Sequence, residues 1–120
     1  MTTQQVADRL VQLCREGKKL EAIEELYADN VVSVEPAGAP VEMTQGKEAV
    51  IKATHQWDES VSEIHSATVS DPIVSATHFA IVMDIDATYK ANGRMRLNEI
   101  CVYEVKDGKI VYDEFFYRWD

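Results

Sequence analysis

Cysteine and proline are scarce in this 120-residue chain, which has two cysteines and three prolines. Cys14 and Cys101 are too few and too far apart for a disulfide framework or a zinc knuckle. No apolar run approaches the roughly 20 residues of a membrane span, and the polar start MTTQQVADRL lacks the order of a signal peptide. These absences predict a reduced, cytoplasmic protein with no membrane partner.

Basic residues are also few, since 12 Lys and Arg stand against 21 Asp and Glu and give a net charge of −9. Such a surface repels a phosphate backbone, and no local cluster of Lys and Arg offsets the repulsion. Nucleic acid is therefore not an expected partner. The chain is 46% hydrophobic, and its length suits one domain over residues 1–120 with a substantial core.

The first half of the sequence has helical periodicity. Apolar residues at helical spacing predict one helix that ends at Gly17, a short second helix that ends before Asp29, and a third over residues 47–60. The predicted apolar stripes are Val6, Leu10, Leu13 and Cys14; Leu20, Ile23, Leu26 and Tyr27; and Val50, Ala53, Thr54 and Trp57. Residues 31–35 are predicted to form a strand, and residues 36–46 a loop.

From Val61 onward the apolar period changes from helical to the two-residue alternation of strands. Strands are predicted near residues 61–70 and 73–89, followed by a hairpin around Asp107-Gly108, a dipeptide suited to a two-residue turn. A regular ladder from this turn places Cys101 opposite Glu114. Before it, a three-residue loop over residues 91–93 is favoured, because a two-residue loop would place Asp86 opposite Glu99.

This register gives the predicted sheet one oily face and one mixed face. The oily face carries Phe79, Ile81, Met83, Ile85, Met95, Leu97, Glu99, Cys101, Tyr103, Val105, Ile110, Tyr112, Glu114 and Phe116. The mixed face has Asp84, Asp86, Arg94 and Arg96 at one end, and Val82, Ile100, Val102, Val111 and Phe115 towards the other. Amphipathic helices are expected to cover the oily face.

Several short motifs give the chain a family resemblance along its whole length. They are Leu26-Tyr27-Ala28-Asp29-Asn30, Val34-Glu35-Pro36, Gly46 before the third helix, and residues 105–111, VKDGKIV. The chain resembles the SnoaL-like branch of the nuclear transport factor 2-like superfamily. The resemblance implies an α+β cone, with three N-terminal helices on a strongly curved, mostly antiparallel sheet around a central pocket, and a homodimer through the convex face.

The resemblance to ketosteroid isomerase within this superfamily makes Glu35 a general-base candidate, since Glu35-Pro36 stands where that family carries its acidic base. The same comparison disfavours steroid isomerisation. Leu10 and Cys101 stand where that family has the two hydrogen-bond donors that stabilise the enolate, and such donors carry much of the catalysis.

Glu99 and Glu114 are the other catalytic candidates, because the predicted register points both into the pocket. Two carboxyls in a dry site without a cation cannot both ionise, so one pKa is expected to rise. A β-bulge would instead turn Glu114 outward and bring Asp113 in, and the alternation around His65 fits either face. The expected ligand-binding residues are Trp57, His65, Phe79, Met83, Cys101, Tyr103, Tyr112 and Phe116.

No metal-ligand spacing, phosphate-binding glycine loop or nucleophile elbow is present in the sequence, so no cofactor or metal is implied. The sequence predicts a protein that binds a small apolar organic molecule. It could be a cofactor-independent lyase, isomerase or hydrolase that uses the pocket carboxylates. The alternative is a non-catalytic ligand-binding or protein-interaction module of the same fold.

Overall fold

A computed structural model describes residues 1–118, which fold into three helices and seven strands. In chain order the elements are α1 (Thr3–Arg15), α2 (Lys19–Leu26), β1 (Tyr27–Val34), β2 (Met43–Gln45), α3 (Lys47–Ser60), β3 (Val61–Val69), β4 (Ile73–Val74), β5 (His78–Tyr89), β6 (Gly93–Lys106) and β7 (Lys109–Phe116). None of the three helices is long and apolar enough to cross a membrane. The α+β class and the three predicted helices are confirmed.

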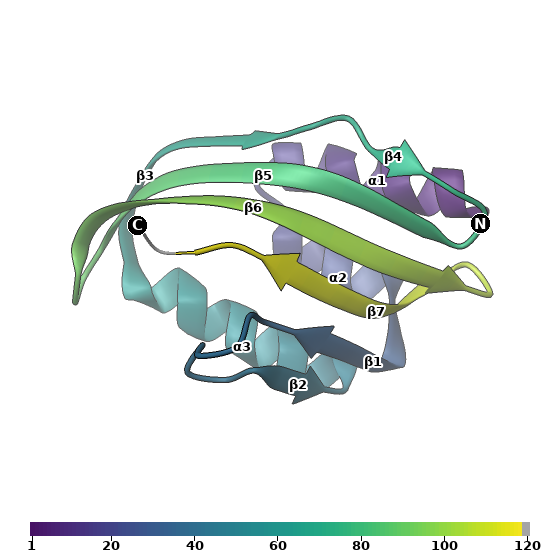
Figure 1. Ribbon diagram of the computed structural model, residues 1–120, viewed down its shortest axis with the longest axis horizontal. Coiled ribbons are helices and arrows are strands. Elements are labelled where there is room, and N and C mark those ends of the chain that lie inside the picture. Colours follow the sequence, from purple (N-terminus) through teal and green to yellow (C-terminus); the bar gives the residue numbers. More distant parts are fainter. Residues whose placement is uncertain (119–120) are drawn as a thin grey trace.

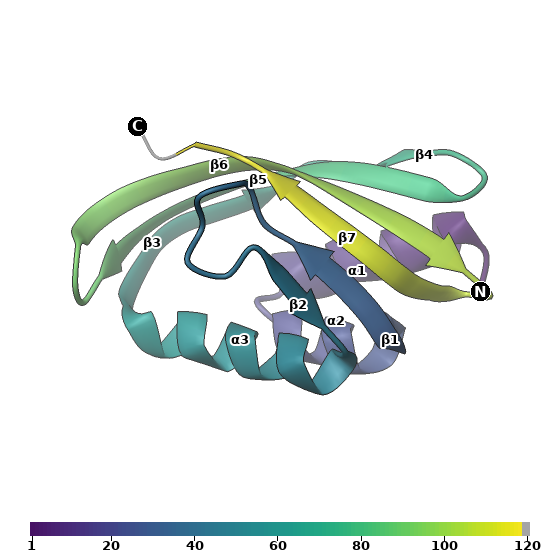
Figure 2. The ribbon, with the colours of Figure 1, turned by 60° about the horizontal axis from the view of Figure 1, so that its bottom comes forward.

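One curled sheet holds all the strands, in the order β2-β1-β7-β6-β5-β3, with β4 paired to β5 at one end. The β1–β7 pair is parallel and the remaining pairs are antiparallel. All three helices lie on one side of this sheet, with α1 behind β5, α2 between α1 and α3, and α3 beside β1, β2 and β3 (Figures 1 and 2). The other side of the sheet has no helix among the described residues.

Helix α1 begins with a capping box, in which the Thr2 hydroxyl accepts from the Gln5 backbone and the Gln5 side chain accepts from the Thr2 backbone. Its apolar stripe packs on the sheet, where Leu10 is fully buried against the core that includes Phe79 and Tyr103. The two aromatic rings stack with centroids 4.7 Å apart. The part of the sheet that α1 covers is therefore closely packed.

Three predicted boundaries are wrong. The predicted loop over residues 36–46 contains the short strand β2, which pairs with the end of β1. The predicted strand over residues 73–89 is broken between β4 and β5, where Ser75 bonds back to His78 through its backbone and its hydroxyl. In addition, Tyr27 begins β1 rather than completing the second helix.

The β5–β6 hairpin keeps the predicted faces in a different register. Tyr89 lies opposite Gly93 and Met83 opposite Glu99, which is two residues away from the predicted pairing. A shift of two residues preserves which side chains share a face. Phe79, Ile81, Leu97 and Glu99 are accordingly buried on the inner face, as expected.

The β6–β7 hairpin has the predicted turn, because Asp107 and Gly108 have φ values of 53° and 75°. The regular ladder predicted beyond it is wrong. Val105 pairs with Ile110 but Glu104 pairs with Tyr112, so Val111 is an extra residue that forms a β-bulge. Every residue of β7 beyond the bulge therefore faces the side opposite to the predicted one.

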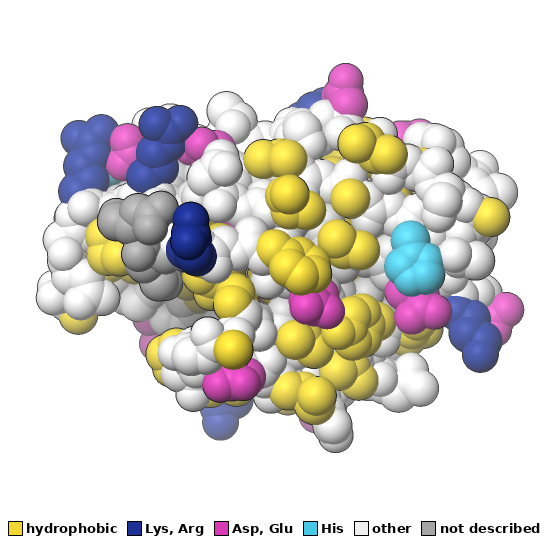
Figure 3. Space-filling view, viewed as in Figure 1, with side chains coloured by type: hydrophobic (Ala, Val, Ile, Leu, Met, Phe, Trp, Pro, Cys, Tyr) yellow, Lys and Arg dark blue, Asp and Glu magenta, His cyan; other side chains and the backbone are white. Residues whose placement is uncertain are grey.

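The outer face of the sheet carries two kinds of surface (Figure 3). At the hairpin end of β5 and β6, Arg94 pairs with Asp86 and Arg96 with Asp84, with nitrogen–oxygen distances of 2.8 and 2.9 Å. Apolar side chains gather over the middle of β5, β6 and β7. We call the three paired residues Val82, Ile100 and Phe116 the Val82–Ile100–Phe116 row, and they are 41, 50 and 49% exposed.

Candidate functional site

A cavity of about 370 Å³ lies between the inner face of the sheet and helices α2 and α3. It exists because α1 packs closely on one end of the sheet, whereas the stripe of α3 stands away from the other end. Val50 is the only buried residue of α3, and its stripe residues Ala53, Thr54 and Trp57 line the cavity instead. Other lining residues include Lys19, Tyr27, Ser33, Glu35, Ile64, Met83, Ile85, Leu97, Glu99, Asp113, Phe115 and Tyr117.

Three carboxyl groups enter this cavity from neighbouring strands. Glu35 directly follows β1, Asp113 lies on β7 and Glu99 on β6, and these strands are adjacent in the order β1-β7-β6. The structure thus brings together two of the three predicted acids, Glu35 and Glu99. The third acid is Asp113 in place of Glu114.

Glu99 is 8% exposed, and burial raises its pKa to about 7. The charge of Lys19 and a hydrogen bond with the Cys101 thiol act in the opposite direction, while the nearby carboxyls of Glu35 and Asp113 add to the rise. A carboxyl with this pKa is present in both protonation states near neutrality. Glu99 is therefore able to accept and to donate a proton.

Asp113 is 1% exposed and burial raises its pKa, although Ser33, Tyr27 and Lys19 all act to lower it. The Tyr27 hydroxyl donates to its Oδ2 at 2.5 Å. Its Oδ1 makes no hydrogen bond of standard geometry within the described chain. One oxygen is thus fixed by Tyr27, and the other is buried beside the cavity that Asp113 lines.

Glu35 is half-buried, and burial raises its pKa in spite of a hydrogen bond from Tyr117. The Tyr117 hydroxyl lies 2.9 Å from Oε2 of Glu35. Lys19 is a cation that acts on all three acids, since its positive charge lowers the pKa values of Glu35, Glu99 and Asp113. The expectation of a pocket without a cation is therefore wrong.

Glu114 lies outside the cavity, because the Val111 bulge turns it to the outer face. There it pairs with Val102 and accepts a hydrogen bond of 2.7 Å from Tyr112. Tyr112 and Phe116 face outward for the same reason, and the expectation that they bind ligand is wrong. Phe115, expected on the outer face, lines the cavity.

His65 is not among the cavity-lining residues, and its ring instead contacts Thr88 of the neighbouring strand β5. Its ring nitrogens lie 2.7 Å from the Thr88 hydroxyl and 3.0 Å from Glu63. The neighbouring Ile64 enters the cavity in its place. The structure therefore does not support the expected contact between His65 and a pocket ligand.

The other predicted ligand-binding residues divide between the cavity and the packed core. Trp57 and Met83 line the cavity. Phe79, Cys101 and Tyr103 point inward as expected, but they are at most 2% exposed and belong to the core under α1 rather than to the lining. The predicted inner face was thus largely correct, while the extent of the cavity along it was not foreseen.

Sequence reasoning missed Lys19, Tyr27 and Tyr117. A signal for Lys19 was present, because it precedes Ile23 by four residues and therefore shares the inner face of α2. Tyr27 was expected on the apolar stripe of the second helix, but not as a hydrogen-bond partner of an acid. Tyr117 gave no comparable signal, since it directly follows the last strand, where the alternation of faces is poorly defined.

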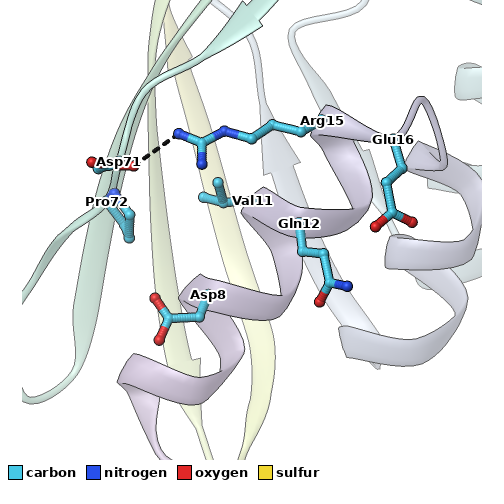
Figure 4. Close-up of a pocket in the computed structure, with 7 residues that line it drawn as sticks. All are labelled: Asp8, Val11, Gln12, Arg15, Glu16, Asp71 and Pro72. Atoms are coloured by element: carbon cyan, nitrogen blue, oxygen red, sulfur yellow. Dashed lines mark hydrogen bonds and ion pairs between the residues drawn. The ribbon is translucent and has the colours of Figure 1, made fainter.

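A second hollow, of about 340 Å³, lies on the surface between α1 and the turn after β3 (Figure 4). Its charged residue Arg15 bonds to the Val69 carbonyl at 2.8 Å and to Asp71 at 2.9 Å. Because these contacts engage its guanidinium, this hollow has little chemistry to offer. Within residues 1–118, no three His, Cys, Asp or Glu side chains are grouped as a metal site.

Comparison with known families identifies the domain, since residues 1–117 match the SnoaL-like domain. The chain belongs to the SnoaL-like family. The three helices and the curled, mostly antiparallel sheet are consistent with this assignment. A comparison with curated proteins found no match.

Solved structures agree with this assignment of the SnoaL-like domain. A proposed SnoaL-like polyketide cyclase from Mesorhizobium loti, also described as a carbohydrate phosphatase, has a TM-score of 0.93 and 34% identity over 98% of this chain and 100% of that one. An NTF2-like protein from Burkholderia thailandensis has a TM-score of 0.83 and 16% identity, over 98% and 92%. A Catenulispora acidiphila protein with a ketosteroid isomerase-like fold, in complex with trimethylamine, has a TM-score of 0.74 and 16% identity, over 97% and 87%.

Proposed function

We propose that this SnoaL-like domain binds a small, largely apolar organic molecule in the cavity and catalyses proton transfer on it without a cofactor. The observation that carries the proposal is the Glu99 carboxyl, which lines an apolar cavity with a pKa raised by burial to about 7. Such matching of a pKa to the working pH is typical of general acid–base groups. The apolar walls from Trp57, Met83, Leu97 and Phe115 suit an uncharged carbon skeleton.

The reaction best suited to this site is proton transfer next to a carbonyl group. The Glu99 carboxylate removes the proton, the C–H electron pair forms a carbon–carbon double bond, and the carbonyl π electrons move to oxygen. The protonated Glu99 then returns the proton to the α-carbon, or to the γ-carbon where the substrate has a β,γ double bond, and the electron pair that forms this C–H bond comes from the enolate or dienolate. Glu35 and Asp113 stand beside this path as further proton carriers.

Hydrogen–deuterium exchange tests this proposal without knowledge of the natural substrate. We expect the protein to accelerate exchange of the α-protons of small apolar ketones in D2O, followed by proton NMR, and Glu99→Gln to abolish the acceleration. Glu114→Gln is the matched control, because Glu114 lies on the outer face. Equal acceleration by Glu99→Gln and the parent protein would remove Glu99 from the mechanism.

The second candidate function is ligand binding without turnover. It is favoured by the hydrogen bonds that Tyr27 and Tyr117 already make to Asp113 and Glu35, which are geometries suited to holding a molecule in place. The trimethylamine complex of the Catenulispora acidiphila protein supports small-molecule binding by this fold. Ketone binding without exchange would favour this function.

We also propose a homodimer that buries the convex outer face of the sheet. The Val82–Ile100–Phe116 row runs directly across β5, β6 and β7 with its side chains about half exposed. Contiguous apolar patches of this kind are often interfaces. This row replaces the patch expected from the sequence, because the Val111 bulge exchanges Phe115 for Phe116.

A further inference from the structure

Lys19, the first residue of α2, is the basic side chain that lines the cavity in the described part of the chain. Its ammonium nitrogen lies 5.9 Å from the centre of the Phe115 ring, which is on the sheet opposite α2. Burial by itself lowers the pKa of Lys19, but Cys14, Asp113, Cys101 and Glu99 more than offset it and the net shift is upward. The side chain is therefore a cation held between the helix layer and the carboxyl groups.

The charge of Lys19 is not used in a direct contact with any acid. Among residues 1–118 it makes no ion pair within 4.0 Å and no side-chain hydrogen bond, and its one close partner is the Phe115 ring. The acids, in contrast, have donors of their own, since Tyr27 donates to Asp113 and Tyr117 to Glu35. The three N–H groups of Lys19 thus remain available to a molecule in the cavity.

A role in charge balance alone explains this placement less well. A partly buried ammonium without hydrogen-bond partners is costly, and a lysine that served only to neutralise the acids would gain most in direct contact with one of them. An ammonium that lines the cavity without such a contact indicates a polar group that the protein itself does not provide.

Two positions on the inner side of the fold supply no oxyanion donor in place of Lys19. Leu10 is a fully buried core residue, and the Cys101 thiol is engaged with Glu99. These are the two positions at which the sequence comparison with ketosteroid isomerase locates the missing donors. A positive charge close to a developing negative oxygen in a water-poor site stabilises it strongly.

We propose that Lys19 binds the negatively charged oxygen of the ligand, and that this oxygen is the enolate formed when Glu99 removes a proton. The inference rests on the proposed proton transfer and specifies its substrate as a molecule whose acidic C–H or O–H group leaves a delocalised oxyanion.

Binding of 4-nitrophenol measures this preference directly, because its neutral and ionised forms differ in colour and no turnover is required. We expect the bound probe to ionise at a lower pH than the free probe. In Lys19→Met the preference for the ionised form should fall at least tenfold, and Lys19→Arg should retain part of it. Lys18→Met is the matched control, since Lys18 is exposed and lies 3.3 Å from Glu16.

The wild-type protein decides the outcome even if a Lys19 variant fails to fold. A bound probe that ionises less readily than the free one, or no binding of the probe, would overturn the role of Lys19. Equal ionisation in the parent protein and a folded Lys19→Met would do the same. Ketone exchange that depends on Glu99 would still support the proposed function in each case, so the two failures are distinguishable.

Discussion

The hydroxyl of Tyr27 lies 2.5 Å from Oδ2 of Asp113, across the parallel pairing of β1 with β7. Both groups are almost completely buried, and this contact ties the start of β1 to the inner face of β7. It also explains how a carboxyl group can be accommodated beside the core, because one of its oxygens has a donor. The position of Asp113 thus depends on a residue from the other half of the chain.

Tyr27→Phe should destabilise the protein by about 1–3 kcal/mol, because a buried carboxyl oxygen loses its hydrogen-bond donor. The pKa of Asp113 should rise further, since Tyr27 acts to lower it. Urea unfolding and carbon-13 NMR of the aspartate carboxyls would measure both effects. Tyr112→Phe is the control, because it removes a comparable bond to Glu114 on the outer face and should cost much less. Equal costs for the two variants would contradict the prediction.

The free energy of unfolding should decrease as pH rises from about 4.5 to 7, in part because of Glu99. Its pKa in the folded state, about 7, lies above its ordinary value of 4.5, so the folded protein binds more protons in this interval. At about 1.4 kcal/mol per pKa unit, the contribution of Glu99 is no more than about 3.5 kcal/mol. Above pH 7 this contribution should be constant.

Glu99→Gln should remove most of this decrease and leave a smaller one, because Glu35 and Asp113 also have raised pKa values. Urea midpoints of both proteins across this pH interval are the measurement. An identical pH dependence in the parent and the variant would show that Glu99 titrates as a solvated group.

Gly108→Ala should be more destabilising than Gly93→Ala, although both glycines have positive φ values, of 75° and 77°. Strain from the backbone conformation is common to both, at roughly 1 kcal/mol. An added Cβ at Gly108 would also lie 3.0 Å from the Met1 nitrogen and 3.1 Å from its oxygen, whereas nothing lies within 4 Å at Gly93. Thermal melting of the two variants compares these costs, and equal losses would mean that the Met1 contact relaxes freely.

Ile100→Asp should convert the proposed homodimer to a monomer, because it places an unpaired charge at the centre of the Val82–Ile100–Phe116 row. Sedimentation equilibrium of the parent and the variant is the measurement. Val41→Asp is the control, since Val41 is 60% exposed in the loop before β2 and lies outside the row. A parent protein that sediments as a monomer would refute the dimer.

The helices and the inner face of β5 and β6 could be predicted because periodicity alone determines them. The predicted pairing of β5 with β6 was wrong by two residues, but such an error leaves every side chain on its predicted face, and Glu99 still points inward. The inward direction of Asp113 could not be predicted with the same certainty. It depends on Val111, and nothing in the local sequence distinguishes a bulged ladder from a regular one.

The boundary between the packed core and the cavity also could not be predicted from the sequence. Phe79 and Met83 lie on the same face of the same strand, and only the position of the helices places one under α1 and the other in the cavity. Lys19 was missed for a related reason. The inner face of the predicted sheet carries no cation, whereas Lys19 belongs to α2 in the helix layer that faces the sheet.

The Val111 bulge determines which side chains of β7 face the cavity and which face the outer side of the sheet. Two sets of side chains alternate along this strand, and each consists of one acid and one aromatic residue. The first set is Asp113 and Phe115, and the second is Glu114 and Phe116. One inserted residue selects which set enters the cavity and which is left for the surface. A single-residue deletion near the turn could therefore exchange the chemistry of the cavity without any substitution within it.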